Sequence, residues 1–178
     1  GVEPIYLSFL TLRECLEAYV LKENLGRSDP VFCSRCQSYQ TCAKQMTMHE
    51  LPPTLTFQLK RFCQQPSTKR WYKNKSHISF PLDGLDLSAF SKQQQTKMAI
   101  EKNGEKTGSS FSYPQLYDLY SVIVHKGTLE NGHYICYIRK KSQWYKCDDS
   151  IVMMTTKHEV LESEAYLLFY ARRTIRQR

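Results

Sequence analysis

The sequence predicts an α+β fold, with a large antiparallel sheet following a single early helix. Two observations support this expectation. Apolar residues recur at three- and four-residue steps over residues 11–22, which is the spacing of one helical face. The later part of the chain reads as a succession of strands, with one short helix expected at residues 157–161. We therefore expect the later strands to form the sheet and the early helix to pack beside it.

The individual elements follow in chain order. Thr11 and Glu14 form a capping-box pattern at the start of the first helix. Residues 55–60 alternate between apolar and polar side chains, which predicts a strand with one buried face. Further strands are expected at residues 78–80, 119–125, 134–138, 143–147 and 165–172.

Composition and charge narrow the class of protein. The chain has 178 residues, of which 41% are apolar, so it suits one globular domain and is too apolar for disorder. Its longest strongly apolar stretch, residues 165–171, is far too short to span a bilayer, and no secretory signal is present. We therefore expect neither a membrane protein nor a secreted one.

The net charge of +8 keeps an acidic partner such as nucleic acid or chromatin in consideration. Residues 60–77 contain six basic residues and no acidic one, with three aromatic side chains among them. Such a run could contact phosphates and stack on bases, although a solvated hairpin loop is the commoner outcome. Direct binding of nucleic acid is therefore the weaker interpretation.

The seven cysteines include the Cys33-Ser34-Arg35-Cys36 pair. In a chain of this size they indicate thiol or metal chemistry in a reducing compartment rather than a disulfide scaffold. The CxxC spacing lets two thiolates hold one tetrahedral zinc ion, but a zinc site needs four ligands. Only Cys42 and His49 lie nearby, so the pair is half a zinc site, and free structural thiols are the alternative.

His133 and Asp148 are the strongest catalytic candidates. A hairpin centred on Lys140 and Lys141 would place His133 directly opposite Asp148, close enough to share a hydrogen bond. A carboxylate on one ring nitrogen fixes the tautomer, as a general base serving a nucleophile requires. Gly132 would let backbone or substrate approach closely. The alternative is a structural histidine that is satisfied by a nearby acid.

Taken in order, these pieces resemble the C-terminal part of the catalytic domain of the ubiquitin-specific proteases, which are papain-like cysteine deubiquitinases. The matching segments cover essentially the whole chain apart from residues 91–112. They are residues 12–16, Cys33 with Cys36, 51–52, 59–62, 80–81, 122–127, 132–134, 144–150 and 165–170. Residues 44–48, 143–149 and 159–163 further resemble the enzymes of the SAGA coactivator's deubiquitinating module.

The resemblance implies the organisation of the chain. It implies a palm with an antiparallel sheet and partial zinc-binding fingers, without the family's thumb subdomain. The fingers would comprise residues 27–50, with zinc on the half-site of Cys33 and Cys36. The remaining parts would be a palm at residues 51–90 and 113–172, a flexible insertion at 91–112 and a basic tail at 173–178.

The resemblance also implies residue roles. His133 would be the general base, Asp148 the acid that orients it, and Asp149 a neighbouring acid that helps order the site. Residues 126–131 would form a blocking loop over the C-terminal tail of ubiquitin. Substrate contacts with that tail are expected from His125, Gly132 and Tyr134.

One element of the family's catalytic apparatus is missing from this sequence. The nucleophilic cysteine of the family lies in a Gly-Asn-Thr-Cys-Tyr box, which does not occur here. The chain begins with Gly1 rather than methionine, so we expect an upstream segment to supply the cysteine, and this chain alone to be inactive. A non-catalytic ubiquitin-binding or scaffolding module is the alternative.

The resemblance finally implies partners and a location. Ubiquitin and ubiquitinated proteins, including histone, are the implied partners, together with subunits of a coactivator complex. The location would be nuclear or cytoplasmic.

Overall fold

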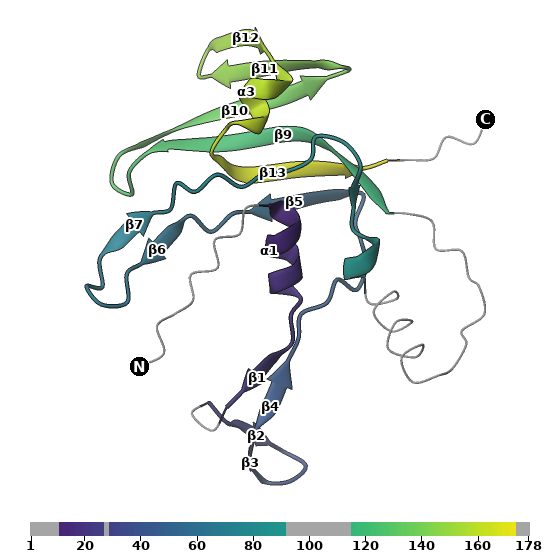
Figure 1. Ribbon diagram of the computed structural model, residues 1–178, viewed down its shortest axis with the longest axis vertical. Coiled ribbons are helices and arrows are strands. Elements are labelled where there is room, and N and C mark those ends of the chain that lie inside the picture. Colours follow the sequence, from purple (N-terminus) through teal and green to yellow (C-terminus); the bar gives the residue numbers. More distant parts are fainter. Residues whose placement is uncertain (1–10, 27–28, 92–114, 174–178) are drawn as a thin grey trace, which may run out of the picture.

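The computed structural model describes residues 11–26, 29–91 and 115–173. Figure 1 shows a broad sheet at one end of the molecule, the helix α1 standing against its lower edge, and a slender projection below that helix. The sheet has seven strands, and six of them follow the order β12-β11-β10-β9-β13-β5, with β8 paired to β9. Every pairing in this sheet is antiparallel. The predicted α+β fold with an antiparallel sheet is therefore confirmed.

The helix α1 comprises Leu12–Tyr19 and begins with the predicted capping box. The backbone N–H of Glu14 donates to Thr11 Oγ1 at 3.1 Å, and the Thr11 N–H donates to Glu14 Oε2 at 2.8 Å. Two backbone N–H groups at the helix start are thereby satisfied. Leu12 and Leu16, one turn apart, face the core.

Five of the six predicted strands are present, and the prediction of the sixth was wrong. Residues 78–80 form no strand, since Ser79 makes only an isolated bridge to Thr11. The edge strand β12 was not expected from the sequence. The strands of the sheet are β5 (Thr54–Gln58), β8 (Leu85–Asp86), β9 (Leu116–Gly127), β10 (Gly132–Lys140), β11 (Gln143–Asp148), β12 (Ile151–Thr155) and β13 (Ala165–Arg172).

Two short helical segments complete this part of the fold: the predicted helix α3, Lys157–Leu161, and a single 3₁₀ turn at Ser88–Phe90. Val160 of α3 and Trp144 of β11 are fully or almost fully buried. The core otherwise joins α1 to the sheet and to the segment after β7, through Leu12, Leu16, Phe80, Leu82, Leu85, Leu87, Phe90, Tyr117, Leu119, Val122, Leu168 and Tyr170.

The projection below α1 consists of two small strand pairs (Figure 1), which we call the finger. Strand β1 (Glu23–Leu25) pairs with β4 (Cys42–Lys44), and β2 (Val31–Cys33) pairs with β3 (Ser38–Gln40). Three-residue strands are too short to give a periodic signal in the sequence.

A further hairpin extends beside the sheet (Figure 1), formed by β6 (Phe62–Gln64) and β7 (Trp71–Lys73). It lies within the basic stretch at residues 60–77, where a hairpin loop was expected.

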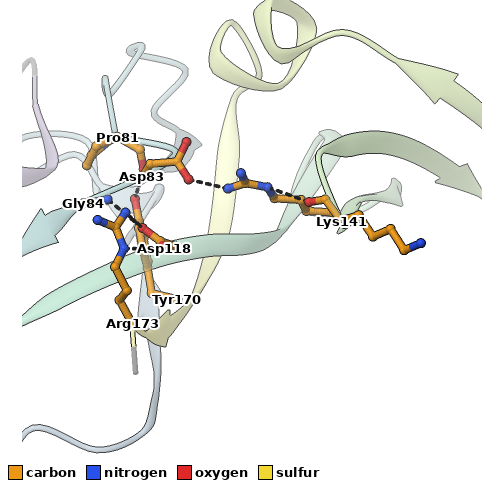
Figure 2. A network of polar contacts seen from close by, with 8 residues as sticks. Pro81, Asp83, Gly84, Asp118, Lys141, Tyr170 and Arg173 are labelled. Atoms are coloured by element: carbon orange, nitrogen blue, oxygen red, sulfur yellow. Dashed lines mark hydrogen bonds and ion pairs between the residues drawn. The ribbon is translucent and has the colours of Figure 1, made fainter. Parts of the chain in front are cut away.

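Polar contacts fasten the loop before β8 to the sheet (Figure 2). Arg173 Nε donates to Asp118 Oδ2 at 2.9 Å, and Asp118 Oδ1 accepts the backbone N–H of Gly84 at 2.8 Å. The hydrogen bond from Arg173 holds the pKa of Asp118 below its usual range. The Tyr170 hydroxyl donates to the carbonyl of Pro81 at 2.7 Å. Arg173, the first residue of the expected basic tail, is therefore bound to Asp118 of β9.

The register of the β10–β11 hairpin differs from the prediction. Its turn consists of Lys141 and Ser142, and Lys140 pairs with Gln143. The expected centre between Lys140 and Lys141 was therefore wrong, and each residue of β10 faces a partner two positions later than expected. A shift of two residues leaves every side chain on its predicted face, because side chains alternate with a period of two.

Parts of the predicted organisation lie outside the described residues. These are residues 92–112 of the expected insertion and residues 174–178 of the basic tail. Within the described residues, no helix is both long enough and apolar enough to cross a membrane.

Candidate active site

His133 and Asp148 lie at the ends of neighbouring strands. His133 is the second residue of β10, and Asp148 is the last residue of β11. The β10–β11 ladder ends at the Cys136–Cys147 pair, so His133 and Asp148 extend beyond it on the same face. Diagonal neighbours on one face remain within reach of long side chains. His133 Nε2 and Asp148 Oδ1 are 2.5 Å apart, so the expected hydrogen bond is present.

Electrostatics favour the charged form of this pair. The hydrogen bond that His133 donates to Asp148 raises the pKa of His133, and the charge of Asp149 acts in the same direction. The hydrogen bond from His133 in turn lowers the pKa of Asp148. Lys126 faces His133 across the β9–β10 ladder, and its charge partly opposes the rise in the pKa of His133. Both shifts favour the charged forms, an imidazolium at His133 and a carboxylate at Asp148, over the neutral ones.

Asp149 lies in the turn after β11 with a φ of 50°, a left-handed conformation that is uncommon for residues other than glycine. Potential ligand atoms of His133, Asp148 and Asp149 all lie within 4.8 Å of one another. They form the one such group of three in the described part of the chain. The structure thus brings together the three residues predicted as catalytic.

The three residues predicted to contact the ubiquitin tail are also neighbours. His125 faces Tyr134 across the β9–β10 ladder, with ring centroids 4.8 Å apart. A Cβ atom on Gly132 would lie 1.9 Å from His125 Nε2, so the absence of a side chain at Gly132 makes room for that ring. Tyr134 is 55% exposed, whereas His125 is only 5% exposed. Tyr134 therefore offers the larger surface to a ligand, and His125 supports it from beneath.

His125 lies in an aromatic cluster that includes Phe62 and Tyr166. Its backbone carbonyl accepts a hydrogen bond from Lys73 Nζ at 2.5 Å. Burial lowers the pKa of His125, and the nearby charge of Lys73 lowers it further. The neutral imidazole is therefore favoured at His125, whereas the shift at His133 has the opposite direction.

Glu159, to which the sequence pattern assigns no role, joins three strands of the sheet. Its carboxylate accepts hydrogen bonds from Tyr137 of β10 at 3.1 Å, Lys146 of β11 at 2.9 Å and Thr155 of β12 at 2.5 Å. These bonds, led by that from Thr155, lower the pKa of Glu159 to about 2. The only signal in the sequence is a Thr-x-x-Glu pattern at the start of α3, where Thr156 caps the Glu159 N–H.

Cys33 and Cys36 lie at the tip of the finger, one at the end of β2 and the other in the turn to β3. Backbone N–H groups of Cys36 and Arg35 donate to the Cys33 sulfur and lower its pKa. This environment favours a thiolate, the form that binds metal. No third metal-ligating side chain joins them among the described residues, so the pair fits half of a tetrahedral site.

Two residues of the basic stretch serve the fold itself. Arg61 is 4% exposed, and its guanidinium donates to the carbonyls of Ala165 at 2.6 Å and Ser76 at 2.8 Å. The Lys73 ammonium lies 3.6 Å from Glu164 and is 5% exposed. Because these two charges are used internally, the basic stretch offers less to a phosphate backbone than its composition suggests.

The molecule is thus an α+β protein whose antiparallel sheet carries a histidine–carboxylate pair at its strand ends. The sequence pattern of the family described as ubiquitin carboxyl-terminal hydrolase matches residues 11–170. The chain therefore belongs to the ubiquitin carboxyl-terminal hydrolase family. The sequence-based resemblance to ubiquitin-specific proteases is confirmed.

Individual relatives agree with this assignment. The chain is 44% identical to ubiquitin carboxyl-terminal hydrolase 51 of Mus musculus, over 93% of this chain and 24% of the relative. It is 40% identical to human ubiquitin carboxyl-terminal hydrolase 27 over 93% of this chain and 37% of that protein. It is 42% identical to human ubiquitin carboxyl-terminal hydrolase 22 over 90% of this chain and 30% of that protein. The chain thus spans between about a quarter and two fifths of these relatives.

Solved structures with the same fold include the SAGA deubiquitinating module of Ubp8, Sgf11, Sus1 and Sgf73 bound to monoubiquitin. The similarity has a TM-score of 0.72 with 32% identity, and it covers 93% of this chain and 33% of that chain. The same module bound to ubiquitin aldehyde has a TM-score of 0.72 and 32% identity, over 93% of this chain and 34% of that chain. These similarities confirm the papain-like fold and the resemblance to the enzymes of that module.

Proposed function

We propose that the protein carrying this chain is a thiol-dependent deubiquitinase, which hydrolyses the isopeptide bond after the C-terminal glycine of ubiquitin. The observation that carries this proposal is the 2.5 Å hydrogen bond between His133 Nε2 and Asp148 Oδ1, on a sheet of the ubiquitin carboxyl-terminal hydrolase family. The bond occupies Nε2 and leaves Nδ1 as the ring nitrogen that can take a proton from a thiol.

The reaction follows from this geometry. Asp148 holds the Nε2–H tautomer and stabilises the imidazolium, as the raised pKa of His133 indicates. Nδ1 takes the thiol proton, the thiolate attacks the carbonyl carbon of the ubiquitin glycine, and the protonated ring returns the proton to the departing lysine amine. Water then hydrolyses the thioester, with His133 accepting its proton.

The nucleophile belongs to a segment of the full protein outside this sequence. Cys136 and Cys147 are the cysteines on the strands of the site, but the alternation along β10 and β11 points them to the opposite face from His133 and Asp148. Neither can deliver a thiol proton to His133. The proposal therefore assigns to this chain the general base and its orienting acids.

The substrate contacts proposed for this chain lie on Gly132 and Tyr134, with His125 beneath them. The exposed ring of Tyr134 suits the narrow, glycine-rich tail of ubiquitin, and Gly132 leaves room for the His125 ring that packs against Tyr134. Ubiquitinated histone is the proposed substrate and a nuclear coactivator complex the proposed setting. Support for ubiquitin binding and for partner subunits comes from a similar Ubp8 structure, which contains Sgf11, Sus1 and Sgf73 with monoubiquitin.

We also propose a structural zinc ion in the finger. Cys33 and Cys36 would supply two of its four ligands, and the backbone donors at Cys33 favour the thiolate that zinc requires. The other two ligands would come from outside the described residues. Zinc would stabilise the tip of the finger and take no part in the hydrolysis.

The experiment compares the full-length protein with its His133→Ala variant in a fluorogenic ubiquitin hydrolysis assay, with ubiquitin binding measured in parallel. We expect the variant to lose turnover by at least about a hundredfold while it binds ubiquitin as the wild type does. His158→Ala, at an exposed histidine of α3, is the matched control and should retain full activity.

Undiminished turnover in the His133→Ala variant would refute the assignment of the general base. If the wild-type full-length protein binds ubiquitin but neither hydrolyses the substrate nor forms an adduct with a thiol-reactive ubiquitin probe, it is a non-catalytic ubiquitin-binding module instead.

A further inference from the structure

Two half-buried free cysteines face each other on the strands that carry the catalytic pair. Cys136 of β10 and Cys147 of β11 are direct partners in the antiparallel ladder. They form its last rung, and Cys147 immediately precedes Asp148. The function proposed above does not use either thiol.

The backbone places the two cysteines within the range of a disulfide. Lys140 and Gln143 close a two-residue turn, and such a pair exchanges both backbone hydrogen bonds. Pair types alternate along the ladder, so the Cys136–Cys147 rung is of the same type, with a Cα separation of about 5.5 Å. Disulfides have Cα separations of about 4.4–6.8 Å.

The two side chains also project from one face of the sheet, and the Cys136 sulfur, which contacts Ser121 Oγ of β9 at 3.3 Å, must turn away from that contact to reach Cys147. Residues directly opposed across a ladder project to the same face of the sheet, with Cβ atoms about 5 Å apart. Because this is a hydrogen-bonded pair, its Cβ separation lies at the wide end of the range, about 5.5 Å. A disulfide needs about 3.8 Å, so the strands must approach by roughly 1.5–2 Å at this rung. The resulting bond would carry some strain and would be correspondingly easy to reduce.

We propose that Cys136 and Cys147 are a site of reversible oxidation, forming a cross-strand disulfide by exchange with a small disulfide such as oxidised glutathione. One cysteine thiolate attacks a glutathione sulfur, which forms a mixed disulfide and releases one glutathione. The second thiolate then attacks the protein sulfur of the mixed disulfide and releases the other glutathione. Two thiols are oxidised and one glutathione disulfide is reduced to two thiols.

The bond would join β10 to β11 at the rung where the strands separate toward His133 and Asp148. The cysteines lie on the other face of the sheet from that pair, so oxidation would leave both side chains of the pair chemically unmodified. Burial, together with the nearby Cys136 sulfur, raises the pKa of Cys147. The exchange should therefore be slow at neutral pH and accelerate as the pH rises.

The test incubates the full-length protein with oxidised glutathione, blocks free thiols with iodoacetamide, and maps tryptic peptides by mass spectrometry without reduction. Trypsin cleaves after Lys126, Arg139, Lys146 and Lys157, so the two cysteines fall in separate peptides, residues 127–139 and 147–157. We expect the disulfide-linked pair of these peptides as the main product of both cysteines. Its amount should fall severalfold when the same reaction is run in denaturant.

Four variants complete the design. Cys136→Ser and Cys147→Ser should each abolish the linked peptide, whereas Cys15→Ser should leave its yield unchanged. A Cys33→Ser, Cys36→Ser double variant removes the competing CxxC pair and should leave the link intact.

The wild-type measurement alone can overturn the proposal, whether or not a variant folds. Separate glutathione adducts on the two peptides without a link would show that the sulfurs cannot meet in the folded protein. The proposal also fails if both cysteines stay free under conditions that oxidise the Cys33–Cys36 pair, or if the link forms equally well in denaturant.

Discussion

Gly132 offers a sharp test of how the strand before His133 is positioned. In the folded chain a Cβ atom at this position would lie 1.9 Å from His125 Nε2, 2.8 Å from Cε1 and 2.9 Å from Cδ2. Ordinary van der Waals contact begins near 3.4 Å, so in a Gly132→Ala variant the ring or the strand must move by about 1.5 Å.

The imidazole of His125 has little room for such a movement. It is 5% exposed and packs against Phe62, Tyr134 and Tyr166. Overpacking of this kind costs about 1–3 kcal/mol. Replacing glycine with alanine in a strand returns about 0.5–1 kcal/mol of chain entropy, so we expect a net loss of roughly 1–2 kcal/mol in the free energy of unfolding.

The assay is urea unfolding followed by tryptophan fluorescence, applied to a double-mutant cycle. Gly132→Ala should destabilise the wild type but cost almost nothing in a His125→Ala background, where the clashing ring is gone. Gly84→Ala is the matched control, because its Cβ has space, with the nearest atom 3.9 Å away, and its φ of +71° imposes only backbone strain. That strain should persist in the His125→Ala background.

Two results would refute the reasoning. Gly132→Ala could leave the unfolding midpoint unchanged, which would mean that the ring yields without cost. It could also destabilise both backgrounds equally, which would place the cause outside the contact with His125.

Three further predictions concern electrostatics and metal binding. Asp148→Asn should lower the pKa of His133, followed by NMR titration of its ring protons, and Asp149→Asn should lower it less, because the hydrogen bond that Asp148 accepts from His133 is the larger cause. Glu159→Gln should destabilise the fold at neutral pH, measured by urea unfolding, and the difference from wild type should vanish as the pH falls from 4.5 toward 2, where the native carboxylate gains its proton. Cys33→Ser should remove zinc from the purified full-length protein, measured by elemental mass spectrometry.

Each of these predictions has a contrary outcome. Equal shifts of the His133 pKa in the two aspartate variants would remove the special role of Asp148. A destabilisation by Glu159→Gln that persists unchanged at pH 2 would mean that the charge of Glu159 is not its cause. Full zinc content in the Cys33→Ser variant would place the metal elsewhere.

The His133–Asp148 pair also predicts a window of stability in pH. Asp148 has a lowered pKa, so its contribution to the free energy of unfolding is present above pH 3.8 and is lost as the pH falls through the lowered pKa. His133 has a raised pKa, so its contribution to the free energy of unfolding is complete below pH 6.5 and is lost as the pH rises through the raised pKa. Asp148→Asn should therefore destabilise the chain most between pH 4 and 6.5, as thermal unfolding across this range would show.

Much of the fold could be predicted because it depends on local signals. The capping box of Thr11 and Glu14 and the apolar period of α1 are properties of neighbouring residues, and both are present in the structure. The helix α3 was predicted with its observed bounds, Lys157–Leu161. The edge strand β12 was missed because the residues Ile151–Thr155 do not alternate in polarity, and the structure exposes four of the five.

The His133–Asp148 contact was predicted correctly from a register that was wrong by two residues. Side chains on a strand alternate with a period of two, so the sequence determines which residues share a face even when the exact pairing is off by an even number. A one-residue error would have separated the pair. The turn at Lys141 and Ser142 decides the pairing, and its geometry depends on the folded hairpin.

The sequence by itself therefore determined the family, the order of the main elements and the face on which the candidate base and its acid lie. Only the tertiary structure decided that Glu159 joins three strands of the sheet and that the His125 ring occupies the space left by Gly132. These contacts join residues on different elements. Such contacts depend on how whole strands and helices pack, and no local pattern of residues encodes that packing.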